Sequence, residues 1–336
     1  MLRAIELAKN GRYSARPNPM VGAVLVANGE IIGEGYHGEY GGPHAEVMAI
    51  NSVRDKSLLK SACLYVSLEP CAHHGKTPPC SDLVIESEIP RVVIANRDPF
   101  ESVNGKGIEK MERAGIKVEI GLCEREAEEM NRVFLHFQKM KRPWICLKWA
   151  ESQDGFIAPF QSEKGRVHWI SHPETQVLTH SWRAEFQGIL IGYKTFIEDD
   201  PSLDTRAIHG PSPRPILWAS KGLGQEKGKI LAPERKAIIL SEEEFNLGNG
   251  ISYESEGFFH KLFEICRKEG IQSILIEGGA KVHQAFIEAG YYDEIRRIKG
   301  KGKLHKGVKA TEIPNNVGLV KQKHFGGDQI ETFRRQ

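Results

Sequence analysis

The stretch Pro43-His44-Ala45-Glu46, followed by Glu69-Pro70-Cys71 and by Pro79-Cys80, decides the fold of the first part of this 336-residue chain. One imidazole and two thiolates are the donors of a tetrahedral Zn²⁺ site that keeps its fourth position open. An isolated His-x-Glu, or two cysteines alone, is more often a helix start or a pair of small buried side chains. Their occurrence together and in this order predicts a metal site made by His44, Cys71 and Cys80.

The same residues suit the hydrolytic removal of an amine from a ring carbon. Zinc lowers the pKa of a bound water towards about 7. Glu46 is not expected to be a ligand, and a carboxylate at its position would carry the proton to the ring nitrogen and to the departing amine. In this respect the motif resembles those of the zinc-dependent deaminases.

Local patterns place the three metal donors at helix starts or strand ends. The turn Asn28-Gly29 is a hairpin signal, and apolar residues at helical spacing after Pro43 put His44 and Glu46 in the first turn of a helix. Helix starts are electropositive, which favours thiolate over thiol. The expected elements are strands over 21–27, 30–36 and 64–68, and helices that begin after Pro43 and at Cys80.

The loop from Ala72 to Pro79 distinguishes this chain from deaminases with a short C-x-x-C spacing. Together with Pro17-Asn18-Pro19-Met20-Val21-Gly22 and Gly33-Glu34-Gly35-Tyr36-His37, it resembles the bifunctional deaminase-reductases of riboflavin biosynthesis. The resemblance implies an N-terminal cytidine-deaminase-like three-layer α/β/α domain in which Glu46 is catalytic. It also implies contacts to the pyrimidinone and its ribosyl phosphate, with Lys76 on the phosphate; the residues are Asn18, His37, His73 and Lys76. Solvated loop positions for His73 and His74 are the alternative.

Length and composition indicate two globular domains with a small-molecule substrate. A chain of this length exceeds what one core usually supports, and 40% hydrophobic with 27% charged residues is ordinary. Because no apolar stretch approaches about 20 residues and no signal peptide is recognised, we expect a cytoplasmic protein without membrane contact. The basic residues gather in 296–309 and 321–335, far along the chain from the zinc motif, so a nucleic-acid partner is not favoured. A homo-oligomer is compatible with the sequence.

The domain boundary is expected at Lys141 and Arg142, since a helical pattern over 124–140 ends before Pro143. Residues 1–141 would form the zinc-dependent deaminase domain, and residues 142–336 an NADPH-dependent reductase domain. Alternating strands and helices in the second part predict a layered α/β domain with a largely parallel sheet. The expected strands are 145–149, 188–192, 215–220, 237–240 and 273–276, and the expected helices are 173–186, 257–268 and 280–289.

Three segments of the second part carry chemistry. Lys148 to Gly155 places polar groups just beyond a strand end. Thr195 to Arg206 is interpreted as a turn with mixed charges. Ile276-Glu277-Gly278-Gly279-Ala280 passes from a strand into a helix whose first N–H groups would bind a pyrophosphate. Each segment alone is more often a turn or loop without a binding role. In this order they resemble the reductase half of the same family, which has a dihydrofolate-reductase-like fold.

This resemblance implies hydride transfer from NADPH to the ribose C1′ of a ring-opened imine. Cationic side chains suit a phosphorylated sugar. The implied cofactor contacts are Ala150, Trp169, Thr195, Asp199, Ser220, Gly279, Ala280, Lys281, Val282, His283, Gln284 and Ala285. The implied substrate contacts are Lys148, Arg183, Leu203, Arg206 and Glu277.

The second part departs from the family pattern in several places. These are Val167, where a serine is usual, an insertion in 159–166, Ala219-Ser220, and lysines and arginines in 295–307, where an apolar strand is usual. Two alternatives therefore stay open. One is a deaminase with an inactive or repurposed reductase domain, and the other is a base-editing deaminase that binds nucleic acid through its basic tail.

Overall fold

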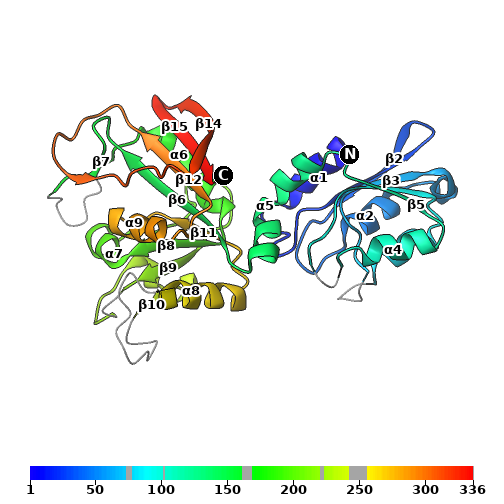
Figure 1. The fold of residues 1–336 in the computed structure, drawn as a ribbon, viewed down its shortest axis with the longest axis horizontal. Coiled ribbons are helices and arrows are strands. Elements are labelled where there is room, and N and C mark those ends of the chain that lie inside the picture. The colour runs from blue at the N-terminus through cyan, green and yellow to red at the C-terminus, as the bar shows by residue number, and fades with distance from the viewer. Residues whose placement is uncertain (73–77, 101–102, 161–168, 220–222, 242–255, 336) are drawn as a thin grey trace. The chain divides into compact units, whose positions relative to one another are not determined.

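The computed structural model describes residues 1–72, 78–100, 103–160, 169–219, 223–241 and 256–335. The chain forms two compact units, Met1–Lys141 and Arg142–Gln336 (Figure 1). The division follows the end of helix α5, Glu124–Met140, where Lys141 adopts a φ of 56°. None of the described helices is long and apolar enough to cross a membrane.

The first unit is built on a five-stranded sheet with the order β2-β1-β3-β4-β5. Asn28 and Gly29 have φ values of 53° and 83°, as the expected type I′ hairpin turn requires. Strand β1 is antiparallel to β2 and β3, while β3, β4 and β5 are parallel. The strands are β1 Gly22–Ala27, β2 Glu30–Tyr36, β3 Cys63–Leu68, β4 Arg91–Asn96 and β5 Lys117–Ile120.

Helices cover both faces of this sheet. A Cβ added at Gly35 would lie 2.4 Å from the Ala49 nitrogen in α2, and one at Gly22 would lie 2.0 Å from the Ala4 oxygen in α1. Gly35 is paired with Ala23, the neighbour of Gly22, so the two glycines point to opposite faces. The expected three-layer α/β/α arrangement is confirmed. The helices are α1 Leu2–Ala8, α2 Ala45–Ser52, α3 Cys80–Glu86, α4 Lys106–Arg113 and α5, with short 3₁₀ turns η1 Lys9–Gly11 and η2 Lys56–Ser61.

The second unit contains an eight-stranded sheet with the order β10-β9-β8-β11-β6-β12-β15-β14. The strands from β10 to β12 are parallel, as expected. The C-terminal hairpin of β14 and β15, red in Figure 1, adds an antiparallel edge that the sequence analysis did not predict. The strands are β6 Trp144–Glu151, β8 Gly188–Gly192, β9 Arg214–Trp218, β10 Ile238–Leu240, β11 Ser273–Ile276, β12 Glu294–Lys299, β14 Val317–Phe325 and β15 Asp328–Arg335, while β7 Phe156–Ala158 and β13 Val308–Lys309 form a separate pair.

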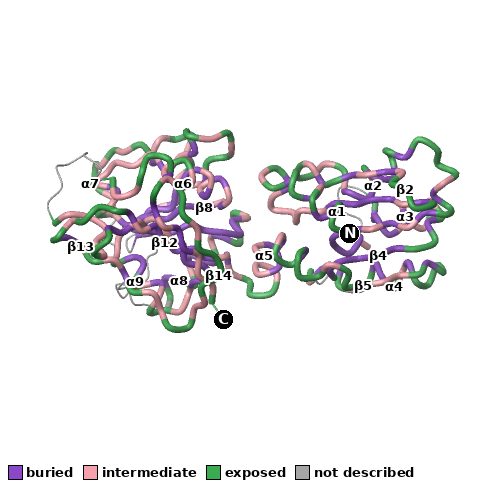
Figure 2. Tube along the Cα trace, turned by 90° about the horizontal axis from the view of Figure 1, so that it is seen from above, coloured by how far each residue is buried: buried purple, intermediate pink, exposed green. Residues whose placement is uncertain are grey.

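Apolar residues on both faces of this sheet are covered. In β11, Ile274 and Ile276 belong to the cluster that includes Phe259 of α8, whereas Leu275 belongs to the opposite cluster with Phe196 of α7. Buried stretches follow the strands in the interior of each unit (Figure 2). The helices are α6 Pro173–Glu185, α7 Tyr193–Asp199, α8 Glu256–Lys268 and α9 Ala280–Glu288, with 3₁₀ turns η3 Lys229–Leu231 and η4 Pro233–Arg235.

Two expectations about this unit need correction. Residues 195–199 belong to helix α7 and not to a turn, because Phe196 is buried against the sheet. The basic residues after 294 do not prevent strand formation. Arg296 pairs with Glu294 of the same strand and with the distant Glu185, and Arg297 pairs with the distant Glu331, so nearby and distant carboxylates compensate the positive charges of β12.

Candidate metal and active sites

The first unit brings His44, Cys71 and Cys80 together. The Nδ1 of His44 lies 3.2 Å from Sγ of Cys80 and 3.6 Å from Sγ of Cys71. All three donor atoms lie within 4.8 Å of one another. One imidazole and two sulfur donors at this spacing fit a tetrahedral zinc ion with one open position.

The starts of two helices position this cluster. His44 is the N-cap of α2, one residue before the first turn in which it was expected, and Cys80 is the first residue of α3. The Cys80 N–H donates to Sγ of Cys71 over 3.3 Å. Hydrogen bonds from the Cys80 thiol and from His44 lower the pKa of Cys71 to about 4, although burial acts in the opposite direction. Cys71 is therefore held as a thiolate, the form that binds a metal.

Glu46 lies in the first turn of α2, beside the metal cluster. Glu46 is 3% exposed, and this burial raises the pKa of its carboxyl group. The same carboxyl group forms a hydrogen bond with Cys80. A carboxyl group with a raised pKa is able to take up and return a proton near neutral pH. The arrangement therefore places a proton carrier next to three metal donors.

Asn18 and His37 border the same cluster. The Nδ1 of His37 donates to the Pro43 oxygen over 3.0 Å, so its Nε2 accepts from the Asn18 amide at 3.1 Å. Burial lowers the pKa of His37, which keeps the ring neutral. The ring packs edge-on against His44, with centroids 5.4 Å apart. The other two expected substrate contacts, His73 and Lys76, lie outside the described residues.

Glu69 is a site residue that the sequence analysis quoted but gave no role. Its carboxylate accepts hydrogen bonds from the backbone N–H groups of Gly105 at 3.1 Å and Gly107 at 3.2 Å. A Cβ added at Gly107 would lie 2.2 Å from the Pro70 oxygen, so α4 begins directly against the turn that carries Cys71. The only sequence signal was the adjacency of Glu69 to Pro70-Cys71.

Asn131 is a second residue that was missed. Its amide oxygen accepts from the Met20 N–H at 2.9 Å, and its amide nitrogen donates to the Met20 oxygen at 2.8 Å. Asn131 interrupts the helical geometry of α5. This pair of bonds holds the segment that contains Asn18 against the first unit's last helix.

The second unit brings Lys148, Arg183 and Glu277 together. Arg183 donates to both Glu277 oxygens, over 3.1 Å from Nε and 2.8 Å from Nη2, and the Lys148 Nζ lies 3.9 Å from the same carboxylate. Burial opposes ionisation of Glu277, but the charges of Arg183 and Lys148 lower its pKa to about 2. Burial also lowers the pKa of Lys148. Three of the five expected substrate contacts thus form one buried charged cluster.

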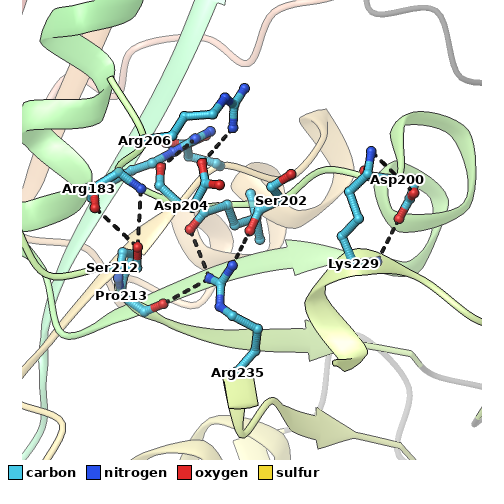
Figure 3. Close-up of polar contacts among 12 residues, drawn as sticks. Arg183, Asp200, Ser202, Asp204, Arg206, Ser212, Pro213, Lys229 and Arg235 are labelled. Carbon is cyan, nitrogen blue, oxygen red and sulfur yellow. Dashed lines mark hydrogen bonds and ion pairs between the residues drawn. The ribbon is translucent and has the colours of Figure 1, made fainter. Parts of the chain in front are cut away.

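The other two expected substrate contacts lie in the segment after α7. Arg206 is exposed and forms an ion pair with Asp204, whose carbonyl oxygen accepts a bond of 3.1 Å from Arg183 (Figure 3). The side chain of Leu203 is 2% exposed and packs in the core. This exposure covers the whole residue, and the Leu203 oxygen accepts from Arg235, so neither the side chain nor the main chain of Leu203 is open to a ligand in this structure.

The start of α9 lies beside the start of α7. A Cβ added at Gly278 would lie 2.5 Å from the Gly192 nitrogen, and one at Gly279 would lie 3.5 Å from Oγ1 of Thr195. The close contact requires glycine at position 278, and the φ of 29° favours it at position 279. The close approach places Thr195 next to the first turn of α9, where helical hydrogen bonds begin only with the N–H groups of Val282 and His283.

The remaining expected cofactor contacts differ in exposure. Val282 and His283 are buried; the Nε2 of His283 lies 3.1 Å from the Ile276 oxygen, and its ring packs against Trp149. The whole residues are only 4% and 2% exposed, and both N–H groups donate to the Gly279 oxygen, so Val282 and His283 offer little to a ligand in this structure. Lys281, Gln284 and Trp169 are exposed, Ala280, Ala285, Ala150 and Asp199 are partly buried, and Ser220 lies outside the described residues.

Two families match successive parts of the chain. Residues 1–96 match the cytidine and deoxycytidylate deaminase zinc-binding region. Residues 143–298 match the RibD C-terminal domain.

Relatives and solved structures match over nearly the whole length. The riboflavin biosynthesis protein RibD of Aquifex aeolicus is 36% identical, with 100% of this chain and 97% of the relative covered. That of Bacillus amyloliquefaciens is 38% identical over 88% of this chain and 82% of the relative. The solved diaminohydroxyphosphoribosylaminopyrimidine deaminase/5-amino-6-(5-phosphoribosylamino)uracil reductase of Thermotoga maritima is 34% identical with a TM-score of 0.88, covering 100% of this chain and 97% of that chain. Acinetobacter baumannii RibD is 32% identical with a TM-score of 0.87 at the same coverage.

Proposed function

Because the chain belongs to the RibD family of riboflavin biosynthesis proteins, we propose how its residues divide the two reactions of a deaminase and reductase that uses zinc and NADPH. The first unit deaminates 2,5-diamino-6-ribosylamino-4(3H)-pyrimidinone 5′-phosphate. The second reduces the ribosyl group of the product to a ribityl chain. The observation that carries the proposal is the group of His44, Cys71 and Cys80 with the buried Glu46 beside it.

In the deaminase unit, His44, Cys71 and Cys80 would hold the zinc. When bound, zinc makes water acidic enough to attack a ring carbon at neutral pH. Glu46 would accept one proton of the attacking water and deliver it to the ring nitrogen, and would then pass the remaining hydroxyl proton to the departing amine. The raised pKa of Glu46 supports this role, because the carboxyl group must hold the proton between the two transfers.

The pyrimidinone would be recognised by Asn18 and His37. The neutral tautomer of His37, held by the Pro43 oxygen, supports a fixed pattern of donors and acceptors at this edge of the site. We retain Lys76 as the phosphate partner and His73 as a further contact on the ground of the family resemblance.

In the reductase unit, Lys148, Arg183 and Glu277 would line the ribose, and Arg206 would face its phosphate. NADPH, when bound, supplies the hydride that C1′ accepts. The buried Lys148, whose pKa is lowered, is suited to give a proton to the ribose ring oxygen as the ring opens. The first turn of α9, with Gly279 and Thr195, would hold the cofactor pyrophosphate. A pyrophosphate at this place supports the other cofactor contacts that the family resemblance implies.

We further propose a cytoplasmic protein that acts on a small molecule and not on nucleic acid. Cysteines that stay free to bind a metal favour a compartment that keeps thiols reduced. Within the basic tail, Arg296 and Arg297 form buried ion pairs with Glu185 and Glu331, and these pairs leave neither arginine for a phosphate. Assembly as a homo-oligomer stays a prediction.

The test is to incubate the zinc-loaded chain with the diaminopyrimidinone phosphate, with and without NADPH. Ammonia release and the loss of NADPH absorbance are followed together. We expect ammonia in both reactions and one NADPH oxidised for each ammonia in the second. Ammonia without NADPH oxidation would restrict the function to deamination.

A further inference from the structure

The segment from Asp200 to Arg206 has a backbone conformation that needs outside support. Asp200 and Leu203 have φ values of 38° and 50°. Residues with a Cβ rarely adopt this left-handed region, because Cβ approaches the following carbonyl oxygen. Contacts from elsewhere in the second unit must therefore select this conformation over more relaxed alternatives.

Arg235, at the end of η4, supplies such contacts. Its Nη1 donates to the Ser202 oxygen, and its Nη2 donates to the oxygens of Leu203 at 3.1 Å and Pro213 at 3.3 Å (Figure 3). The planar guanidinium presents five donors in a rigid fork, so one side chain can bind several carbonyl groups at once. Arg235 thus ties the two sides of the loop between α7 and β9 together.

The turn η3, which precedes η4, holds the Asp200 end of the segment. The Lys229 N–H donates to Oδ1 of Asp200 at 2.9 Å, and its Nζ donates to the Asp200 oxygen at 3.1 Å. Ile230 is fully buried in the cluster that also contains Leu203. The residues from Lys229 to Arg235 therefore act as a brace that is itself anchored in the core.

The braced segment leads directly into the charged cluster. The Asp204 oxygen, next to Leu203, accepts a bond from Nη1 of Arg183, and the Asp204 carboxylate pairs with Arg206. Arg183 in turn holds Glu277. A shift of the Leu203 carbonyl group would also move the Asp204 oxygen that binds Arg183 and the Asp204 carboxylate that pairs with Arg206.

We propose that Arg235 is a positioning residue for the reductase substrate: it fixes the Ser202–Asp204 main chain so that Arg183 and Arg206 present their charges to the phosphorylated ribose. This inference rests on the proposed reductase function. Lysine cannot replace the fork, because its three donors radiate from one nitrogen and cannot span the carbonyl groups that two guanidinium nitrogens reach.

The experiment uses the full zinc-loaded chain with Arg235→Ala and Arg235→Lys. The matched control is Arg214→Ala, because Arg214 also donates to a backbone oxygen near η4, that of Lys236, but its other partner is Glu269, the residue after α8. The KM and kcat for the deaminated substrate, the Kd for NADPH and the rate of ammonia release are measured. Methylguanidinium is added to the alanine variant as a chemical rescue.

We expect both Arg235 variants to raise the KM for the deaminated substrate by about 10-fold to 100-fold, the size of a lost charge-assisted contact. The Kd for NADPH and ammonia release should stay at the parent values, methylguanidinium should lower the KM of the alanine variant, and Arg214→Ala should keep the parent KM. If the alanine variant does not fold, Arg235→Lys carries the same expectation.

Three results would overturn the inference. They are an unchanged KM in the Arg235 variants, a full parent KM with lysine, or an equal loss of NADPH and substrate binding, which would mark a merely structural residue. A parent chain that releases ammonia but oxidises no NADPH would instead overturn the proposed reductase function, and the positioning role with it.

Discussion

The metal cluster of the first unit and the charged cluster of the second are built in different ways. His44 and Glu46 share one helix start, and Cys71 and Cys80 flank one loop, so the chemistry is visible as a motif. Lys148, Arg183 and Glu277 come from β6, α6 and the end of β11, and meet only through the parallel sheet. Short-range motifs therefore reveal a metal site, whereas a site assembled across strand ends depends on the packing of the whole unit.

The strongest test of this comparison is Glu46→Gln. If Glu46 carries protons and does not hold metal, zinc content should stay stoichiometric while ammonia release falls by about 100-fold to 10 000-fold. Metal content is measured by elemental analysis and turnover by ammonia assay. Cys71→Ala is the contrasting variant and should lose the metal. A zinc-free Glu46→Gln protein would contradict the separation of roles.

Glu277→Gln tests the charged cluster. It leaves Arg183 and Lys148 buried without their carboxylate, which should lower the free energy of unfolding of the second unit by about 3 to 5 kcal/mol. All five tryptophans lie after residue 141, so fluorescence in urea reports on this unit alone. Glu288→Gln, on the exposed side of α9, is the control and should change stability by less than about 0.5 kcal/mol. Ammonia release should persist in both variants, and equal stabilities would show that the cluster is not electrostatically coupled.

His283→Gln probes the second unit through pH. Burial lowers the pKa of His283 from 6.5 to about 4, so the folded unit disfavours the proton that the unfolded chain accepts. The stability that depends on the neutral ring is complete above pH 6.5 and is lost as the pH falls towards 4, a difference of about 3 kcal/mol. The variant should lack this part of the pH dependence when urea unfolding is followed between pH 7.5 and 4. The exposed His324→Gln should behave like the parent, and identical slopes for all three proteins would refute the assignment.

The smallest expected effect belongs to Glu69→Gln. Each Glu69 oxygen accepts from a different backbone N–H, so the amide of glutamine must oppose one of them. The turn that carries Cys71 should loosen, and zinc affinity should fall by about 10-fold to 100-fold, as for other residues that orient metal ligands. Competition with a chelator measures this, with the exposed Glu86→Gln as control. An unchanged affinity would mean that the Cys71 turn is held by the local sequence alone.

Many secondary elements were predictable because their signals are local. The hairpin at Asn28-Gly29 follows from the positive φ that its turn requires, and the helix over 124–140 follows from apolar periodicity that stops before Pro143. Helix α7 was missed because the acidic Asp199 and Asp200 and the basic Arg206 together suggested a turn. Phe196 of this helix packs on the sheet, and this tertiary contact, which the sequence does not show, stabilises the helix.

The hardest element to predict was β12. Its sequence carries Arg296 and Arg297 where an apolar strand is usual, and these residues were therefore interpreted as a departure from the family pattern. The charges are nevertheless satisfied by Glu185 of α6 and by Glu331 of β15. Sequence periodicity cannot reveal such compensation, because the partner carboxylates are 111 and 34 positions away.

The sequence by itself determined which residues meet in the metal cluster, the carboxyl group beside them and the order of the two units, because these depend on residue type and on spacing within short segments. Only the tertiary structure decided that Glu69 accepts from the start of α4, that Leu203 and His283 turn their side chains into the core, and that Arg235 binds the loop beside Arg183. The reason is physical. Burial, hydrogen-bond partners and the charge around a buried group are properties of surfaces brought together by packing, and residues far apart in the chain supply them.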